Sequence, residues 1–401
     1  MTFAELRIIA AFSSIALVCV LPGCGGGSGS KSPPVANNTQ PIIVNAGPNG
    51  NYANGLFTTV TVCAPGSSNC QAISGVLVDT GSFGLRVLSS ALTAPLTQQK
   101  DSSGNSVVEC AQFSLGITWG PVKTADVKIA GEQASAIPIQ VIGDPAFSMV
   151  PSGCSAKGAP QDTLQSLGAN GILGIGSFIQ DCGPACAPGT SNNPGFYYGC
   201  AGSSCQVITQ SAAQQVQNPI AFFSADNNGV IVDLPAVSTS APSVSGSLIF
   251  GIGTQSNNSL GSAQVLTLDP STGNFSTKFN GTTYSKAGFI DSGSNAYFFL
   301  DSTTTGIPDC PSSLPGFYCP SSPANLTATN IGANNTSTVV NFTIDNASTL
   351  FSNTTDNVFP TLGGPNPGTF DWGLPFFFGR KVYTAIEGAN TPGGPGPYWA
   401  Y

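Results

Sequence analysis

The chain has 401 residues, a length typical of two domains, and only 7% of them are charged, against roughly 25% in an average soluble protein. It contains no histidine, which excludes a Ser-His-Asp triad, a Cys-His pair and a histidine-ligated metal. The 11 Lys and Arg residues are outnumbered by 19 Asp and Glu residues, so we expect no nucleic-acid partner.

The N-terminal stretch has the pattern of an export signal. An apolar run covers residues 8–21, shorter than the about 20 residues that span a bilayer, and it ends in Leu-Pro-Gly-Cys at Cys24. This ending resembles the lipobox of bacterial lipoproteins, so we interpret residues 1–24 as a lipoprotein signal peptide with Cys24 as the lipidated residue. Residues 25–40 then form a flexible tether to a membrane, and Gly25 favours the outer membrane, at its periplasmic or outer face. The alternative is an ordinary signal peptide cleaved elsewhere.

Ten of the 12 cysteines lie beyond Cys24. An even number in an exported chain predicts up to five disulfides, and close neighbours in the sequence would close short loops. The closest are Cys63 and Cys70, Cys200 and Cys205, and Cys310 and Cys319. The alternative is a zinc site made of Cys182, Cys186, Cys200 and Cys205, but an oxidising compartment disfavours free thiolates. We therefore expect disulfides and no metal.

Short apolar or alternating runs, interrupted by Gly, Pro, Asn and Ser, predict strands along the rest of the chain. They cover residues 56–62, 75–79, 122–129, 136–142, 220–223, 230–234, 247–252 and 264–268. Helical periodicity is limited to residues 163–167 and 208–217. The sequence therefore predicts a mainly β protein.

One motif occurs twice, each time after an apolar strand. Residues 79–82 read Asp-Thr-Gly-Ser and residues 291–294 read Asp-Ser-Gly-Ser, 212 residues further along the chain. A repeat once per half-chain predicts two homologous lobes, residues 41–240 and 241–401, each supplying one aspartate. The alternative is coincidence, because Asp and Gly are common turn formers, and the two turns would then lie far apart.

If the two turns meet, their carboxyl groups can act together as an acid and a base. The carboxylates of Asp79 and Asp291 would lie roughly 3 Å apart and share one proton, since both cannot ionise at that distance. Such a pair can activate a water molecule while protonating a carbonyl oxygen, as the aspartic proteases do, without a metal or a cofactor. Backbone N–H groups and hydroxyls beside the pair would support it. These come from Thr80, Gly81, Ser82, Ser292, Gly293 and Ser294.

The two turns and several segments around them resemble the pepsin-like aspartic proteases, and the lipobox and loops resemble a bacterial lipoprotein family within that superfamily. Residues 79–87 and 290–294 are similar to the two active-site turns. Further similar segments are residues 116–131 (the flap hairpin and the next strand), 170–176, 246–251 and 372–387. The resemblance implies a bilobal β-barrel architecture with a cleft between two homologous lobes, and it implies catalytic roles for Asp79 and Asp291.

The sequence departs from that family beside the first turn. Phe83 stands where the family usually has Ser or Thr, and Arg86 stands where it commonly has Trp. The tyrosine of the family's flap has no counterpart, and Phe113 or Trp119 could fill its volume. Because Phe83 and the missing tyrosine each remove a hydroxyl donor, we expect a slower enzyme, by ~10²-fold.

The interpretation that follows is a monomeric, membrane-anchored aspartic endopeptidase that cleaves a polypeptide substrate in the cleft, best in mild acid. The alternative is a weakly active or inactive binding module for a protein ligand at the cell envelope, because fold does not determine function. A binding module normally loses one aspartate of the pair, whereas this chain has both.

Overall fold

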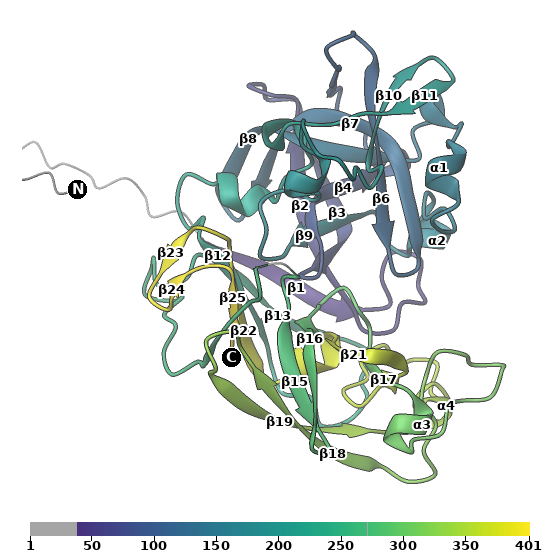
Figure 1. Ribbon diagram of the computed structural model, residues 1–401, viewed down its shortest axis with the longest axis vertical. Helices are drawn as coiled ribbons and strands as arrows, with labels where there is room; N and C mark the ends of the chain where they lie inside the picture. The colour runs from purple at the N-terminus through teal and green to yellow at the C-terminus, as the bar shows by residue number, and fades with distance from the viewer. Residues whose placement is uncertain (1–37, 271) are drawn as a thin grey trace, which may run out of the picture. The chain divides into compact units, whose positions relative to one another are not determined.

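The computed structural model describes residues 38–270 and 272–401, and it consists mainly of β-strands (Figure 1). The expected signal peptide, Cys24 and most of the expected tether lie outside the described residues. No helix in the described part of the chain is both long and apolar enough to cross a membrane. The prediction of a mainly β fold with two lobes is confirmed by the arrangement of the strands.

The first lobe is a closed barrel within a 16-stranded sheet. Neighbouring strands follow the order β7, β8, β4, β9, β3 and β2, and β2 also pairs with β7, which closes the ring. The hairpin of β6 and β7 and the strands β10 and β11 extend this lobe. The bounds are β2 (Gly55–Cys63), β3 (Cys70–Asp79), β4 (Phe83–Leu88), β5 (Thr97–Gln98), β6 (Ser106–Phe113), β7 (Gly116–Ile129), β8 (Glu132–Ile142), β9 (Gly171–Ile175), β10 (Tyr197–Ala201) and β11 (Ser204–Val207).

The same sheet continues into strands that come from both ends of the described chain, and we call this part the shared sheet. Its strands are β1 (Thr39–Asn45), β13 (Val244–Phe250), β12 (Gly229–Leu234), β22 (Arg380–Ala385), β25 (Tyr398–Ala400) and β14 (Val265–Thr267). β1 pairs with β2 on one side and with β13 on the other, so it joins the barrel to the shared sheet. In Figure 1 the shared sheet lies between the two lobes.

The second lobe is built on a seven-stranded sheet. In spatial order its strands are β19 (Ser337–Ile344), β18 (Ala324–Ile331), β15 (Phe275–Phe279), β16 (Thr282–Ile290), β21 (Asn366–Trp372), β17 (Tyr297–Leu300) and β20 (Gly363–Gly364). β23 (Asn390–Thr391) and β24 (Gly394–Pro395) form a separate small pair. The four α-helices of the described residues are single turns: α1 (Ser152–Ser155), α2 (Leu164–Leu167), α3 (Ser302–Thr305) and α4 (Ala347–Leu350).

Two predicted elements are wrong. Residues 208–217, predicted as a helix, contain one 3-10 turn at Ala212–Gln214, because neighbouring segments accept the backbone N–H groups before it. Residues 220–223, predicted as a strand, lie largely in a 3-10 turn at Pro219–Phe222. The side chain of Asn218 caps this turn, and proline at its first position favours it.

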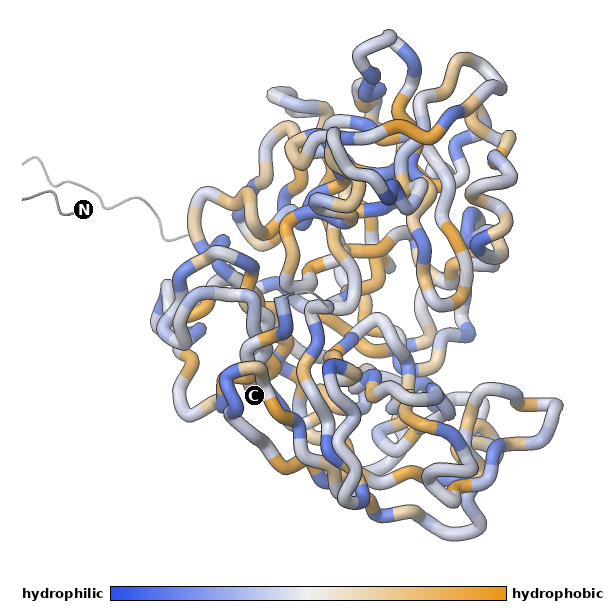
Figure 2. Tube along the Cα trace, in the orientation of Figure 1, coloured by the Kyte–Doolittle hydropathy of each residue, from blue (hydrophilic) through white to orange (hydrophobic). Residues whose placement is uncertain are grey.

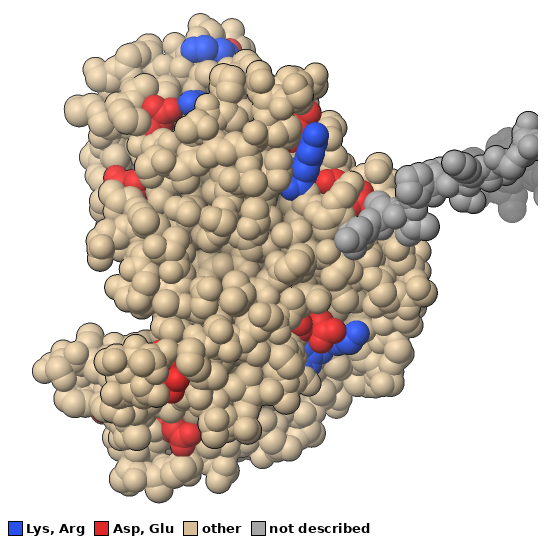
Figure 3. Space-filling model, turned by 180° about the vertical axis from the view of Figure 1, so that it is seen from behind, with Lys and Arg blue, Asp and Glu red and all other residues tan. Residues whose placement is uncertain are grey.

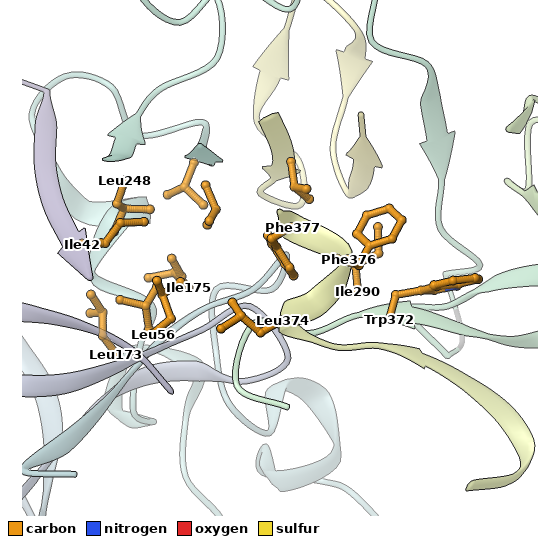
Figure 4. Packing of buried hydrophobic residues seen from close by; sticks show 14 of the residues in the cluster. Ile42, Leu56, Leu173, Ile175, Leu248, Ile290, Trp372, Leu374, Phe376 and Phe377 are labelled. Atoms are coloured by element: carbon orange, nitrogen blue, oxygen red, sulfur yellow. The ribbon is translucent and has the colours of Figure 1, made fainter. Parts of the chain in front are cut away.

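Apolar side chains from both lobes form one continuous core. Hydrophobic residues alternate with polar ones along many strands (Figure 2), as expected for sheets with one buried face. In Figure 4, Leu374 lies between aliphatic side chains of the first lobe, such as Ile175, and the aromatic side chains of Phe376 and Trp372. The core therefore continues from one lobe into the other beneath the site described below.

All ten described cysteines form disulfides, which confirms the predicted bonding. Two bonds join directly opposed residues of neighbouring strands, β2 with β3 and β10 with β11, and another ties β6 to α1 across 44 residues. The bonds are Cys63–Cys70, Cys110–Cys154, Cys182–Cys186, Cys200–Cys205 and Cys310–Cys319. Since the four candidate zinc ligands are paired with one another, the zinc interpretation is wrong.

The surface carries few charges. In Figure 3, Lys, Arg, Asp and Glu appear as isolated groups on an otherwise uncharged face. The partly exposed ion pairs are Lys123–Asp144, Lys286–Asp269 and Lys381–Asp233. Pairs of this kind contribute little to stability, so apolar burial and the disulfides carry most of it.

Candidate active site

Each repeated turn begins where a buried strand ends beside a parallel neighbour. Asp79 is the last residue of β3 and lies opposite Gly174 of β9. In the second lobe, β16 runs parallel to β21 and ends at Ile290, opposite Trp372, so Asp291 is the next residue. Because both turns begin at equivalent places in equivalent strand pairs, the local fold delivers the two aspartates in the same way.

The two turns are in direct contact, which contradicts the coincidence interpretation. The Thr80 hydroxyl donates to the carbonyl oxygen of Ile290 (3.1 Å) and accepts from the backbone N–H of Ser292 (2.9 Å). In the reverse direction, the Ser292 hydroxyl donates to the carbonyl oxygen of Val78 (2.8 Å) and accepts from the N–H of Thr80 (3.1 Å). These four buried hydrogen bonds fix the lobes against each other at the aspartates.

A glycine of each turn approaches both carboxyl groups. The N–H of Gly81 donates to Asp79 Oδ1 (2.8 Å), and the N–H of Gly293 donates to Asp291 Oδ1 (2.7 Å). A Cβ atom on Gly81 would lie 2.6 Å from Cγ of Asp291, and one on Gly293 would lie 2.6 Å from Oδ1 of Asp79. Only glycine therefore allows each turn to reach the opposite carboxyl group.

The hydroxyl groups make the site asymmetric. Ser82 Oγ donates to Asp79 Oδ2 (2.5 Å). Its counterpart, Ser294 Oγ, lies 2.8 Å from Asp291 Oδ2 and 2.7 Å from Oδ2 of a third carboxyl group, Asp371. A hydroxyl has one proton to donate, so one of these two carboxyls must itself be protonated for both contacts to be hydrogen bonds.

Burial and the nearby charge of Asp291 raise the pKa values of two of these carboxyl groups, Asp79 and Asp371. Asp79 and Asp291 lie within hydrogen-bonding reach of each other; burial, and then the negative charge of Asp291, raise the pKa of Asp79 well above its usual range. Burial is also the main reason that the pKa of Asp371 is raised, and the charge of Asp291 adds to it. Asp371 Oδ1 has no hydrogen-bond partner within the described residues, as expected for a neutral acid at an apolar position.

A cavity of about 320 Å³ opens above the pair. Its walls include Asp79, Asp291, Phe113 at the end of β6 and Phe289 on β16; Gly81, Ser82, Gln112 and Ser114 complete its lining. The two aromatic side chains face carboxyl groups that can hold a proton, so the cavity combines an apolar wall with a polar floor.

The two flap candidates occupy different places. Phe113 lines the cavity, whereas Trp119 is buried with its indole N–H donating to the carbonyl oxygen of Phe147 (2.7 Å), so Trp119 belongs to the core. The expected position of the hairpin is also wrong: its turn lies at residues 114–115, and Gly116–Ile129 is one continuous strand. Trp119 therefore lies beyond the turn that faces the cavity.

Asp371 is not among the site residues predicted from the sequence, although the sequence carries a signal for it. An acid inside the apolar segment of residues 370–378 is unusual. The strand register shows which residue of the first lobe is equivalent to Asp371. Two residues before Asp79 along β3, the parallel strand β9 has Ile172. At the same distance before Asp291 along β16, the parallel strand β21 has Asp371. The second lobe thus carries an acid where the first has an aliphatic side chain.

Three comparisons with known proteins bear on this geometry. The fold is similar to that of the crystal structure of the aspartic proteinase from Irpex lacteus, with a TM-score of 0.51 and 15% sequence identity, over 90% of this chain and 96% of that chain. At this identity the likeness shows the fold alone. A search of curated proteins gives no match. The family model described as "Protein of unknown function (DUF3443)" matches residues 34–401, and the chain therefore belongs to that family.

Proposed function

We propose that the protein is an aspartic endopeptidase in which Asp79 and Asp291 jointly activate a water molecule. The observation that carries the proposal is the matched support of the two carboxyl groups: each accepts from a glycine N–H and a serine hydroxyl of its own turn, and both face the same cavity. Paired acids with such support are arranged to share a proton.

The chemistry needs two protonation states in the same pair. With one proton between Asp79 and Asp291, the ionised carboxylate accepts a proton from water, and the protonated carboxyl donates to the peptide carbonyl oxygen. Water attacks the carbonyl carbon to give a tetrahedral gem-diol. The carboxyl that took the proton from water then gives it to the nitrogen, the C–N bond breaks, and the other carboxylate takes a proton back from a gem-diol hydroxyl as the carbonyl re-forms, which restores the pair. This mechanism requires no cofactor, metal or nucleophilic side chain.

The test is the digestion of an unfolded polypeptide by the mature protein from about pH 3 to 8, with Asp79→Asn and Asp291→Asn as inactive variants. Asp356→Asn changes a partly exposed carboxyl that accepts from Asn353, and it is the matched control, which should retain full activity. We expect cleavage in mild acid that fades as the shared proton is lost. If the wild-type protein cleaves no faster than either variant at any pH, the proposal fails.

A second candidate, a peptide-binding module, is favoured by the apolar lining of the hairpin. Phe113 stands at the cavity without a hydroxyl that could donate to a substrate, and Phe83 packs edge-to-face against Phe178 instead of supplying a hydroxyl near Asp79. If calorimetry shows that the wild-type protein binds an unfolded polypeptide, and digestion assays show that it does not cleave it, the result supports this function over catalysis.

We also propose that the protein is a lipoprotein anchored to a membrane through Cys24. The support is the lipobox-like ending of residues 8–24 and the flexible composition of the next residues. Mass spectrometry of the N-terminal peptide should find a diacylated cysteine, and Cys24→Ala should move the protein from the membrane fraction to the soluble fraction. An unmodified N-terminus cleaved elsewhere would contradict it.

A further inference from the structure

Behind the hairpin of β6 and β7 lies a buried group of charged side chains. Arg86 of β4 is 2% exposed, and its Nη2 atom contacts Glu109 Oε1 of β6 (2.5 Å) and Asp181 Oδ2 (2.9 Å). Asp181 precedes the 3-10 turn Gly183–Cys186. Arg86 Nη1 donates to the carbonyl oxygen of Phe83. In a chain with 7% charged residues, three such residues in one buried place call for a physical reason.

The charges of this cluster do not balance unless it holds a proton. It contains one cation and two carboxyl groups, and Glu109 Oε1 and Asp181 Oδ2 both contact the same nitrogen atom of Arg86, so the two carboxyls lie close together. With both carboxyls ionised, the cluster would bury a net negative charge, which is strongly unfavourable. One proton on the pair makes the cluster neutral.

The surroundings favour the protonated form. The titratable groups that face one another here are Arg86 from β4, Glu109 from β6, Tyr197 from β10 and Asp181 itself. Burial, followed by the charge of Glu109, raises the pKa of Asp181 well above its usual range, while Arg86 opposes this. The Tyr197 hydroxyl donates to Asp181 Oδ1 (2.6 Å) and accepts from the N–H of Val216 (2.7 Å), so it is neutral and fixed.

The cluster is linked directly to the cavity wall. Glu109 and Phe113 are four residues apart on one strand, so their side chains point to the same face of it. The guanidinium carbon of Arg86 lies 5.6 Å from the ring centre of Phe113, within the range of a cation–π contact. Phe113 lines the cavity together with Asp79 and Asp291. A change in the charge of the cluster therefore acts on the strand and on the ring that cover the pair.

We propose that Arg86, Glu109 and Asp181 form a proton-dependent positioning device for the hairpin of β6 and β7. With one proton shared by the two carboxyls, the cluster is neutral and holds Phe113 at the cavity. When that proton is lost, the two carboxylates repel each other, the cluster draws in water and the hairpin loosens. The consequence for catalysis rests on the proposed function, whereas the movement of the hairpin does not.

Hydrogen–deuterium exchange of the amides of residues 106–129 tests the device without relying on activity. The reference protein is the Asp79→Asn variant, in which neither self-digestion nor the shared proton of the pair can contribute. After correction for the intrinsic pH dependence of exchange, protection of the hairpin should fall roughly tenfold in one step as the pH rises, the equivalent of one lost charge-assisted hydrogen bond. A flat profile from acid to neutral pH would overturn the proposal.

Isosteric variants identify the source of the step. In Glu109→Gln or Asp181→Asn, a single carboxylate balances Arg86 at every pH, so the step should disappear and the protection seen in acid should persist. Asp144→Asn is the matched control, because this carboxyl pairs with Lys123 of the same hairpin outside the cluster, and the step should remain. If the step persists in a folded Glu109→Gln or Asp181→Asn protein, the cluster is not its source and the proposal is wrong. If neither variant folds, the pH profile of the Asp79→Asn reference protein is the test, and a flat profile overturns the proposal. An inactive wild-type protein that keeps the step would refute only the proposed function.

Discussion

Replacing Asp371 by asparagine tests whether the third carboxyl group, beside Asp79 and Asp291, carries a proton. Ser294 Oγ contacts both Asp291 and Asp371, and the structure explains this if Asp371 is a neutral acid that donates to the serine, which in turn donates to Asp291. The carboxamide of Asp371→Asn supplies the same donor, and it cannot ionise. The variant should therefore fold with the same contacts, but the titration of the Asp371 carboxyl group should no longer contribute to its stability.

The magnitude follows from linkage between protonation and folding. The pKa of Asp371 is raised in the folded state from an ordinary value of 3.8, so above about pH 4 the unfolded chain releases a proton that the folded protein keeps. The contribution of protonated Asp371 to the free energy of unfolding is thus present in acid, and it is lost as the pH rises toward the pKa of Asp371 in the folded protein. Each retained proton changes the free energy of unfolding by about 1.4 kcal/mol per pH unit. The stability of Asp371→Asn relative to wild type should rise by that amount per unit in this window.

Urea unfolding at a series of pH values from about 4 to 7 measures this difference directly. Asp371→Ala provides the comparison: it also lacks the titration and should show the same slope, but it should be less stable than Asp371→Asn by about 1 kcal/mol throughout, because it has lost the hydrogen bond to the serine. A difference between Asp371→Asn and wild type that does not change with pH would refute the reasoning, since Asp371 would then be ionised in the folded protein as in the unfolded chain.

Three further substitutions test other parts of the structure. Removing the Cys110–Cys154 bond, which closes a loop of 44 residues, by a double change to serine should cost about 4 kcal/mol in urea unfolding, and unchanged stability would contradict it. Gly81→Ala should cost about 1–3 kcal/mol and abolish the proposed cleavage, because its Cβ would meet Asp291; a variant as active as wild type would show that the turn can move. Thr80→Val leaves buried backbone groups unpaired between the lobes and should lower the stability by about 1–3 kcal/mol, with calorimetric melting as the measurement and an unshifted transition as the contrary result.

The two aspartate turns could be predicted from the sequence because the signal is local. An apolar strand followed by Asp-Thr/Ser-Gly-Ser specifies the end of a strand, a tight turn and a carboxyl group in one short segment, and its repetition indicates a second lobe. The disulfides that join opposed strand residues, such as Cys63–Cys70, were equally accessible because their partners are close in the sequence. Residues 163–167 followed the same principle, since Thr163 caps a single helical turn there.

The features that escaped prediction depend on the register between distant strands. Glu109 and Asp181 meet because β10 aligns Tyr197 opposite Glu109 and the loop before it returns to the same place, which no short segment encodes. Asp371 reaches Ser294 only through the parallel pairing of β16 with β21. Trp119 lies in the core for a related reason: the hairpin turn lies a few residues before the predicted position, and this shift places the side chain away from the cavity.

The shared sheet is completed only by strands at the end of the chain. β22 and β25 follow every strand of both lobes along the chain. In the sheet that lies between the lobes, β22 pairs with β12 and β25 pairs with β22. While the chain is being synthesised, β12 has an open edge until residues 380–385 emerge, and β22 in turn has one until residues 398–400 emerge, so the shared sheet is unfinished. Nascent chains therefore expose an unpaired strand edge in the shared sheet after both aspartate turns have been made, and this edge is covered only when synthesis has passed the last of these strands.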